Sequence, residues 1–341
     1  MKVVITGHLG YIGTVLTKML VSEGYEVVGI DSDLYRDCTF GAELLKVPTI
    51  NKDIRDITVE DLKGFDSVLH LAGLSNDPLG NLNPELTYEI NHRASVRLAE
   101  LSKKAKIRRY VFSSSCSNYG ASGNDFLTEE SPFYPVTPYG ESKVRVEKDV
   151  SLMADDSFSP VFLRNATAFG VSPRIRFDLV LNNLVAWAFT TGKVMLKSDG
   201  RAWRPIVHIE DISRAFIAVL KAPVETIHNE SFNVGLTGEN YRIREIAELV
   251  AEVVPNCHLQ FADDASTDTR NYRVNCDKII RTLKDYQPRW TARKGAQELY
   301  EAYKKNGLRL EEFEGPRYQR IGHIRKLLKD KVINEDLRFI Q

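Results

Sequence analysis

Short apolar runs alternate with longer amphipathic segments through the first half of the chain. The apolar runs predict buried strands at residues 2–6, 26–30, 47–51, 67–71, 109–114 and 160–164. The amphipathic segments predict helices near residues 14–23, 84–105 and 139–154. Strands that alternate with helices pair in parallel through right-handed crossovers, so the pattern predicts an α/β fold with a doubly wound parallel sheet.

The alternation of strands and helices breaks after Gly170. Segment 171–205 holds an arginine-rich loop and an apolar helix near 178–190, and segment 206–234 returns to helix and strand. Further helices and short strands lead to a polar, charged tail at about 306–341. We therefore expect a first domain of residues 1–170 and about 206–234, and a smaller α/β domain of about 171–205 and 235–341. The cleft between two such domains is the default place for a substrate.

Composition narrows the possible classes of protein. The 341 residues include 46 basic and 46 acidic ones, and this balance is not that of a protein that binds nucleic acid. No apolar run is long enough to span a bilayer, and the first strand begins at residue 2, so we expect neither a membrane anchor nor a signal peptide. Four scattered cysteines without a C-x-x-C pair fit a reduced, cytoplasmic protein that has no metal site.

Three glycines with the spacing G-x-x-G-x-x-G lie between the first predicted strand and the first predicted helix. They are Gly7, Gly10 and Gly13. Small residues let the backbone approach a pyrophosphate, and a helix N-terminus offers it free N–H groups. Asp31, at the end of the second strand, can accept hydrogen bonds from both ribose hydroxyls and would repel a 2′-phosphate, which favours NAD over NADP. The alternative is a glycine-rich turn and a surface aspartate.

Tyr139 and Lys143 are four residues apart on one face of a predicted helix. A nearby ammonium group favours the phenolate, so we expect the pKa of Tyr139 to fall towards the range of a general base. The same lysine can bind the nicotinamide ribose. Ser113, Ser114 and Ser115 end a predicted strand, and a hydroxyl there can hold the substrate oxygen. The alternative for the pair is an ordinary helix surface.

Five features, taken together, carry a family resemblance. They are TGHLGYIG at residues 6–13, Asp31, HLAG at 70–73, SSSCSNYG at 113–120 and PYGESK at 138–143. With them the chain resembles the extended short-chain dehydrogenase/reductases, and more narrowly the NAD-dependent nucleotide-sugar epimerases and dehydratases. The resemblance covers roughly residues 1–303. It implies that the first domain is an NAD-binding Rossmann domain and the second binds the nucleotide sugar.

The resemblance also implies roles for individual residues. It implies that the pyrophosphate is bound by Gly7, Gly10, Tyr11, Ile12 and Gly13, and the adenosine ribose by Asp31. It further implies that Asp53 and Ile54 flank the adenine, and that Leu71, Ala72 and Gly73 pass beneath the cofactor. By the same resemblance Tyr139 is the catalytic base or acid, Lys143 is its partner and Ser115 is the assisting hydroxyl. Tyr139, Lys143 and Ser113 are also expected to contact the cofactor. Asn91 either orders this site or caps a helix N-terminus.

The second domain is expected to hold the nucleotide sugar. Arg204 and Arg270 stand where relatives place arginines on the diphosphate, and planar guanidinium groups suit phosphate oxygens. The remaining candidate substrate contacts are Ser115, Cys116, Ser117, Thr167 and Arg174. The resemblance further implies a homodimer through the helices at 84–105 and 139–154. Apolar positions on these helices, Leu98, Leu101, Val144 and Val150, allow it, although a stripe that faces the core would look the same.

Three departures from the family pattern bear on the reaction. Cys116 and Ser117 replace the Asp-Glu pair of 4,6-dehydratases, which disfavours that elimination, and a packed thiol is the favoured interpretation of Cys116 over an acid/base role. Thr167 stands where many relatives have an asparagine. Arg174 and Arg176 replace part of the usual loop, where they either reach an anionic group of the substrate or lie in a solvated loop.

The favoured function is that of an NAD-dependent nucleotide-sugar 4-epimerase. A nucleotide-sugar 4-dehydrogenase or 4-ketoreductase is the close alternative, because the three reactions share one half-reaction. A non-catalytic NAD-sensing protein would be expected to lose the Tyr139–Lys143 pair, which the chain retains. A dehydrogenase for a steroid or other small alcohol is disfavoured by Arg204 and Arg270, by analogy alone.

Overall fold

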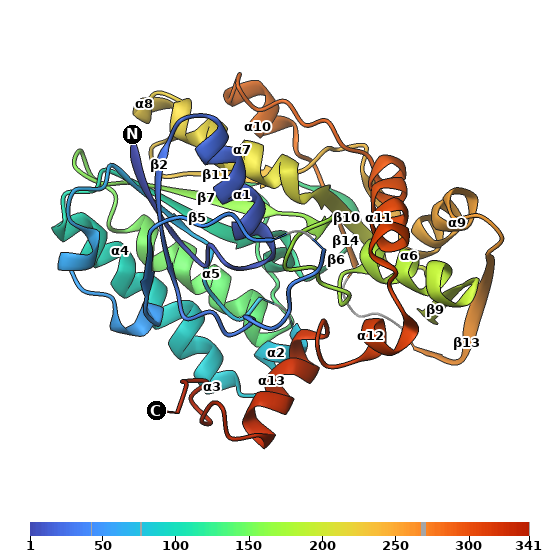
Figure 1. Ribbon diagram of the computed structural model, residues 1–341. Coiled ribbons are helices and arrows are strands. Elements are labelled where there is room, and N and C mark those ends of the chain that lie inside the picture. The colour runs from blue at the N-terminus through green and yellow to red at the C-terminus, as the bar shows by residue number, and fades with distance from the viewer. Residues whose placement is uncertain (42, 76, 267–270, 341) are drawn as a thin grey trace.

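A parallel sheet forms the centre of the computed structural model, which describes residues 1–41, 43–75, 77–266 and 271–340 (Figure 1). Within these residues the strand order is β3-β2-β1-β4-β5-β7-β11. The bounds are β1 Lys2–Thr6, β2 Glu26–Asp31, β3 Thr49–Asn51, β4 Ser67–His70, β5 Arg109–Ser115, β7 Ser159–Asn165 and β11 Glu230–Val234. The order reverses beside β1, so the carboxyl ends of β1 and β4 open a crevice for a ligand. The predicted doubly wound fold is confirmed.

Helices cover both faces of this sheet. Helices α1 (Tyr11–Ser22) and α7 (Ile209–Lys221) lie on one face, and α4 (Ala94–Lys104) and α5 (Pro138–Ser151) lie on the other (Figure 1). Neighbouring residues of β1 join different core clusters, Val3 with the α1 side and Val4 with the α4 side. Burial on both faces explains why these strands are continuous apolar runs in the sequence.

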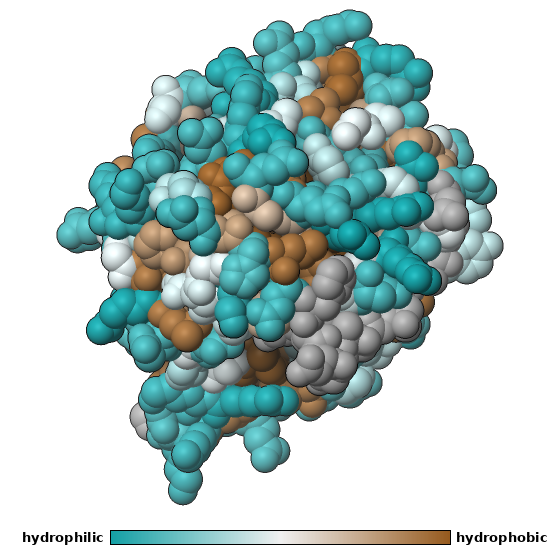
Figure 2. Space-filling model, turned by 90° about the vertical axis from the view of Figure 1, so that its right-hand side faces the viewer, coloured by the Kyte–Doolittle hydropathy of each residue, from teal (hydrophilic) through white to brown (hydrophobic). Residues whose placement is uncertain are grey.

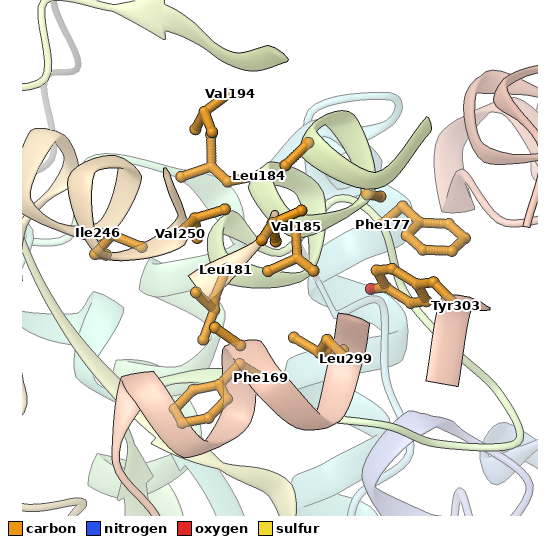
Figure 3. Close-up of a cluster of buried hydrophobic side chains, with 14 of the residues drawn as sticks. Phe169, Phe177, Leu181, Leu184, Val185, Val194, Ile246, Val250, Leu299 and Tyr303 are labelled. Atoms are coloured by element: carbon orange, nitrogen blue, oxygen red, sulfur yellow. The ribbon is translucent and has the colours of Figure 1, made fainter. Parts of the chain in front are cut away.

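A second core lies beside the sheet, around α6 (Figure 3). Its elements are β8 Thr167–Phe169, α6 Val180–Thr191, β9 Lys193–Ser198, β10 Trp203–His208, β12 Asn240–Arg242, α9 Ile243–Val253, β13 His258–Ser266 and α11 Ala292–Asn306. Leu181 and Val185 of α6 pack there with Val250 of α9 and Leu299 of α11. The helix predicted near 178–190 is therefore the centre of this core.

The chain after α11 folds back over both cores. Phe313 of α12 joins the second core, whereas Ile324 and Leu327 of α13 join the core cluster that also contains Val68 of the sheet. The sequence predicted only a polar, charged tail here. The predicted division into two domains at the stated boundaries stays a prediction. The remaining elements are α2 Asp77–Gly80, α3 Pro84–Thr87, β6 Ala121–Leu127, α8 Val224–Ile227, β14 Asn271–Val274, α10 Asp277–Thr282, α12 Leu310–Glu314, α13 Arg320–Lys329 and the 3₁₀ turns Ile54–Asp56, Glu60–Leu62 and Cys116–Tyr119.

The helix predicted at 84–105 contains a π-helical segment. Helix α3 continues into a π-helical segment at Tyr88–Arg93 and then into α4. The apolar residues considered for a dimer interface face inward: Leu98, Val144 and Val150 are buried, and Leu101 packs against the core. They are part of a stripe that faces the core, so the homodimer stays a prediction that rests on the resemblance alone.

One face of the molecule is largely polar. Figure 2 shows one face on which hydrophilic side chains surround small apolar patches. In the part of the chain that the structure describes, no helix has both the length and the apolar character needed to cross a bilayer.

Candidate active site

One cavity at the carboxyl ends of β1, β4 and β5 collects most of the candidate residues. Its lining includes every residue assigned to the cofactor, from Gly7, Gly10, Tyr11, Ile12, Gly13, Asp31, Asp53 and Ile54 to Leu71, Ala72, Gly73, Ser113, Tyr139 and Lys143. It also includes three of the residues assigned to the substrate, Ser115, Ser117 and Thr167. Residues that are far apart in the sequence thus form one continuous site.

The turn between β1 and α1 requires glycine for steric reasons. Gly7 has a φ of +77°, and a Cβ there would lie 2.6 Å from the backbone nitrogen of Ala72. A Cβ at Gly13 would lie 2.1 Å from the carbonyl oxygen of Gly7. The N-cap of α1 is Gly10, which provides no side-chain cap, so the first N–H groups of the helix are left for a ligand. This cradle fits the pyrophosphate of a dinucleotide.

Asp31 is held in a fixed orientation at the end of β2. Its Oδ2 accepts a hydrogen bond from the backbone N–H of Leu9 at 3.0 Å, and its Oδ1 accepts one from Asp33 at 2.8 Å. Burial raises its pKa, while these N–H groups lower it. Each carboxylate oxygen can accept a further hydrogen bond, as the two ribose hydroxyls require.

Asp53 is already paired inside the protein. Its Oδ1 and Oδ2 accept hydrogen bonds from Nε and Nη2 of Arg55, at 2.9 and 2.8 Å. Burial acts to raise the pKa of Asp53, but the hydrogen bonds from Arg55 outweigh it and the pKa is lowered. Asp53 therefore lines the cavity as a neutralised pair whose position is fixed.

The N-terminus of α5 presents Tyr139 and Lys143 to the cavity. Thr137 caps the helix by accepting a hydrogen bond from the N–H of Gly140, and Tyr139 and Ser115 both line the cavity. Nζ of Lys143 lies 5.8 Å from the centroid of the Tyr139 ring and donates to the carbonyl oxygen of Ser113 at 2.8 Å. The pair therefore shares one helix face, as the spacing predicted.

The expected fall in the pKa of Tyr139 is wrong for the protein alone. Burial raises the pKa of Tyr139, and the effect of the Ser115 hydroxyl, which lowers it, offsets only part of that rise. Burial also lowers the pKa of Lys143 to about 8, against the opposing charge of Glu147. Both groups thus favour their neutral forms more than they would in water.

Asn91 ties the loop after β4 to the helix beside it. Its Oδ1 accepts a hydrogen bond from the N–H of Leu74 at 2.7 Å, and its Nδ2 donates to the carbonyl oxygen of Leu74 at 2.9 Å. It lies in the π-helical segment, and the N-cap of α3 is Asn83, so the capping alternative for Asn91 is wrong. Asn91 therefore orders the loop that follows β4.

Comparison with known proteins identifies the family of the chain. The NAD dependent epimerase/dehydratase family matches residues 3–235. The chain belongs to this family. It is accordingly an enzyme, and its cofactor is NAD.

The relatives of the chain include sugar-nucleotide epimerases. The UDP-glucose 4-epimerase of Lactobacillus helveticus is 31% identical over 274 residues, which are 74% of this chain and 82% of the relative. That of Bacillus subtilis (strain 168) is 26% identical over 335 residues, 88% of this chain and 94% of the relative. The structure of the UDP-glucose 4-epimerase of Thermotoga maritima, solved with UDP-glucose, has a TM-score of 0.78 at 22% identity, covering 90% of this chain and 100% of that one. This likeness supports the fold alone.

Several residues assigned to the substrate lie away from the cavity. Cys116 is fully buried, its Sγ donates to the carbonyl oxygen of Arg164 at 3.1 Å, and burial raises its pKa, so it is a packed thiol. Arg174 is also buried, and it pairs with Asp33 at 2.9 Å and with the backbone carbonyl of Tyr35. The structure thus does not bring Cys116 or Arg174 to the cavity wall.

The two arginines expected on the diphosphate cannot be judged alike. Arg204 is buried, and its Nη1 donates to the carbonyl oxygen of Trp203 at 2.8 Å. Its guanidinium lies 5.5 Å from the ring centroid of Tyr272, which lines the cavity. Arg270 lies outside the described residues. Contact of either arginine with a diphosphate stays a prediction.

Sequence reasoning missed several residues on the cavity wall, among them Ser75, Asp77, Asn165, Asp178 and Arg320. Arg176, which the sequence left undecided, joins them: its guanidinium pairs with Asp178 at 2.6 Å and donates to Oγ of Ser75 at 3.1 Å. Asp77 accepts a hydrogen bond from Thr137 at 2.7 Å, and its charge raises the pKa of Tyr139. The position of Asp77, four residues after HLAG, was the only signal that pointed to it.

The described residues fit NAD. Oδ1 of Asn165 is a buried atom with no hydrogen-bond partner on this wall, and the glycine turn leaves the first N–H groups of α1 without a side-chain cap. In the same described ranges, no three His, Cys, Asp or Glu side chains gather as a metal site would require. The residues present would therefore hold NAD, with the pyrophosphate at the glycine turn and one ribose at Asp31.

We predict that burial of the Lys143 charge costs stability in the NAD-free protein. Between pH 8 and the usual lysine pKa the unfolded chain binds more protons than the folded one, so this cost is present at neutral pH and fades as the pH rises through that window. The lowered pKa of Lys143 corresponds to a cost of about 3 kcal/mol in the free energy of unfolding. The hydrogen bond to Ser113, which the methionine variant loses, offsets about 1 kcal/mol of that cost. Lys143→Met should therefore raise the free energy of unfolding by about 2 kcal/mol at pH 7 and by much less at pH 10.

Urea unfolding at the two pH values measures this difference. Lys148→Met is the matched control, because Lys148 is an exposed lysine of the same helix. A gain that does not change between the two pH values would contradict the assignment.

We also predict that the protein prefers NAD to NADP. A 2′-phosphate beside Asp31 would meet a like charge and lose the ribose hydrogen bonds, a penalty of roughly 2–4 kcal/mol. Calorimetric titration of the NAD-free protein with each cofactor measures it. Equal affinities for NAD and NADP would show that Asp31 does not bind the adenosine ribose hydroxyls.

Proposed function

We propose that the protein is a nucleotide-sugar 4-epimerase. The observation that carries this proposal is that the Tyr139 phenol and the Ser115 hydroxyl line the same cavity as Lys143 and the glycine turn. A phenol and a hydroxyl side by side can hold one alcohol oxygen of a substrate and exchange its proton. When bound, NAD supplies the redox step, since it accepts a hydride from C4 of the sugar and returns it.

Tyr139 serves both directions of the proton transfer. It accepts the proton of the C4 hydroxyl during oxidation and gives it back to the oxygen of the 4-keto sugar after the sugar has turned in the cleft. Burial favours the protonated phenol, which is the form needed for the return step. The positive charge of Arg176 acts in the other direction and lowers the pKa, which assists proton acceptance.

The walls of the cavity argue against 4,6-dehydration. That reaction needs an acid to protonate the leaving oxygen, and the positions after Ser115 hold Cys116 and Ser117. The Cys116 thiol is buried outside the cavity, and its pKa is raised well above the usual value. A serine hydroxyl is a poor acid for the same task. Epimerisation has no leaving group, so it needs no acid at positions 116 and 117.

The relatives indicate which sugars to test first. Those named above are UDP-glucose 4-epimerases, so we propose a UDP-hexose as substrate. Thr167 lines the cavity and can donate one hydrogen bond to the diphosphate in place of the usual asparagine. Arg204 is proposed as its charged partner.

Product analysis tests the proposed reaction. The purified protein is incubated with UDP-glucose and, separately, with UDP-galactose, without added cofactor, and the products are identified by NMR. Interconversion without added NAD or NADH supports a 4-epimerase, because the cofactor is regenerated in each turnover. Product that forms only in proportion to added NAD or NADH would instead indicate the 4-dehydrogenase or 4-ketoreductase.

We predict that Tyr139→Phe lowers kcat by at least about a hundredfold, the usual contribution of general acid–base catalysis. The change removes only the oxygen that transfers the proton, so NAD affinity and the unfolding temperature should stay close to the wild-type values. Tyr134→Phe is the control, because Tyr134 is an exposed tyrosine on the preceding loop. A near-normal rate in Tyr139→Phe would refute the catalytic assignment.

We predict that Arg204→Ala weakens the binding of UDP about ten- to a hundredfold and leaves NAD affinity unchanged. Lysine should restore the affinity only in part, since an ammonium cannot make the two-pronged contact of a guanidinium. Calorimetric titration with UDP measures this without knowledge of the sugar. Arg201→Ala, at a nearby exposed position, is the control. If Arg204→Ala binds UDP as tightly as the wild type does, the arginine has only a structural role.

A further inference from the structure

Arg320 brings a buried guanidinium from the C-terminal segment to the cavity wall. It is the first residue of α13, only 2% of its surface is exposed, and it lines the cavity that contains the glycine turn. Its guanidinium stacks on the ring of Tyr35 at 3.9 Å, and its Nη2 donates to the carbonyl oxygen of Arg174 at 3.0 Å. These two contacts fix the plane of the group.

The charge of Arg320 is not balanced by the protein. The two neighbouring arginines each have a carboxylate: Arg174 pairs with Asp33 at 2.9 Å, and Arg176 pairs with Asp178 at 2.6 Å. Across the described residues, no carboxylate forms an ion pair with Arg320, and its Nη1 has no hydrogen-bond partner. A buried cation without a counter-charge is costly. Such a group on a cavity wall favours an anionic ligand.

Hydrogen bonds connect Arg320 to the start of α1. The carbonyl group that it contacts belongs to Arg174, whose N–H donates to Oγ of Ser172 at 3.1 Å. That hydroxyl donates to the carbonyl oxygen of Tyr11, the first residue of α1, at 2.8 Å. On its other side Arg320 stacks on Tyr35, four residues after Asp31. Arg320 is thus linked both to the phosphate-binding turn and to the segment that follows the ribose-binding acid.

We propose that Arg320 binds the pyrophosphate of NAD and that α13 is therefore part of the cofactor site. A guanidinium held flat by stacking presents its free N–H groups in a fixed plane, which suits phosphate oxygens. The C-terminal segment then does more than complete the core, because it supplies the positive charge opposite the glycine turn. The inference depends on NAD binding and not on the sugar or on the reaction proposed above.

Titration with parts of the cofactor tests this role. ADP carries the two phosphates, whereas adenosine carries none, so a pyrophosphate contact must separate them. For the full chain freed of NAD, we expect Arg320→Met to weaken ADP binding about ten- to a hundredfold and adenosine binding less than threefold. Arg320→Lys should fall between Arg320→Met and the wild type. Arg325→Met, at an exposed arginine of the same helix, should change neither affinity.

Three outcomes would overturn the proposal. Unchanged ADP affinity in Arg320→Met would show that the guanidinium does not contact the phosphates. An equal loss of ADP and adenosine affinity would assign Arg320 to packing of the adenosine end of the cavity. A loss confined to NADP, with NAD and ADP unaffected, would place the group at a 2′-phosphate. If Arg320→Met does not fold, the comparison of ADP with adenosine is made on Arg320→Lys, and ADP affinity equal to that of the wild type then counts against the proposal.

Discussion

The geometry of the site depends on the hydrogen bonds of the buried Tyr11 phenol. It donates to the carbonyl oxygen of Gly170 at 2.7 Å and accepts a hydrogen bond from Nδ2 of Asn182 at 3.0 Å. The amide of Asn182 also accepts from the N–H of Gly170 and donates to the carbonyl oxygen of Arg176. Tyr11 is the first residue of α1, directly after the glycine turn, whereas Asn182 belongs to α6 at the centre of the second core. The glycine turn and the second core are therefore positioned by one hydrogen-bonded unit.

Close to these hydrogen bonds, the cavity holds ionisable groups whose burial lowers the stability of the ligand-free protein. Lys143 and Arg320 are buried cations whose pKa values burial lowers, and Tyr139 is a phenol whose pKa burial raises. If only the stability of the folded chain mattered, apolar side chains would be favoured at these positions. A site that must bind a dinucleotide and move a proton needs them, so local stability is given up where function requires charge. NAD binding then restores stability by mass action, because only the folded chain forms the cradle.

The sequence predicted best where the evidence was local. The central strands were located to within about two residues at most ends, because most of them are largely buried and contain a run of apolar residues, although β3 is mostly exposed. The glycine turn and the Tyr139–Lys143 spacing are likewise local patterns. Contacts between distant segments left no such pattern. The charges of 306–341 concealed Ile324 and Leu327, whose core cluster is formed mostly by residues of the first half of the chain. Arg174 and Arg176 are two residues apart, yet only Arg176 lines the cavity, and that difference is set by Asp33, Asp178 and the folded loop.

The end of β5 shows why the reaction type is not decided by one residue. Ser115 and Ser117 line the cavity, whereas Cys116 between them points into the protein, against the carbonyl oxygen of Arg164 and the amide of Asn233. A carboxylic acid placed at 116 would keep this inward position and would add an acid to the core instead of the cavity. Burial there would also keep it protonated but out of reach of a sugar oxygen. A carboxylic acid at 117 would instead face the cavity, so the backbone path at 115–119 determines which of these positions can reach a bound substrate.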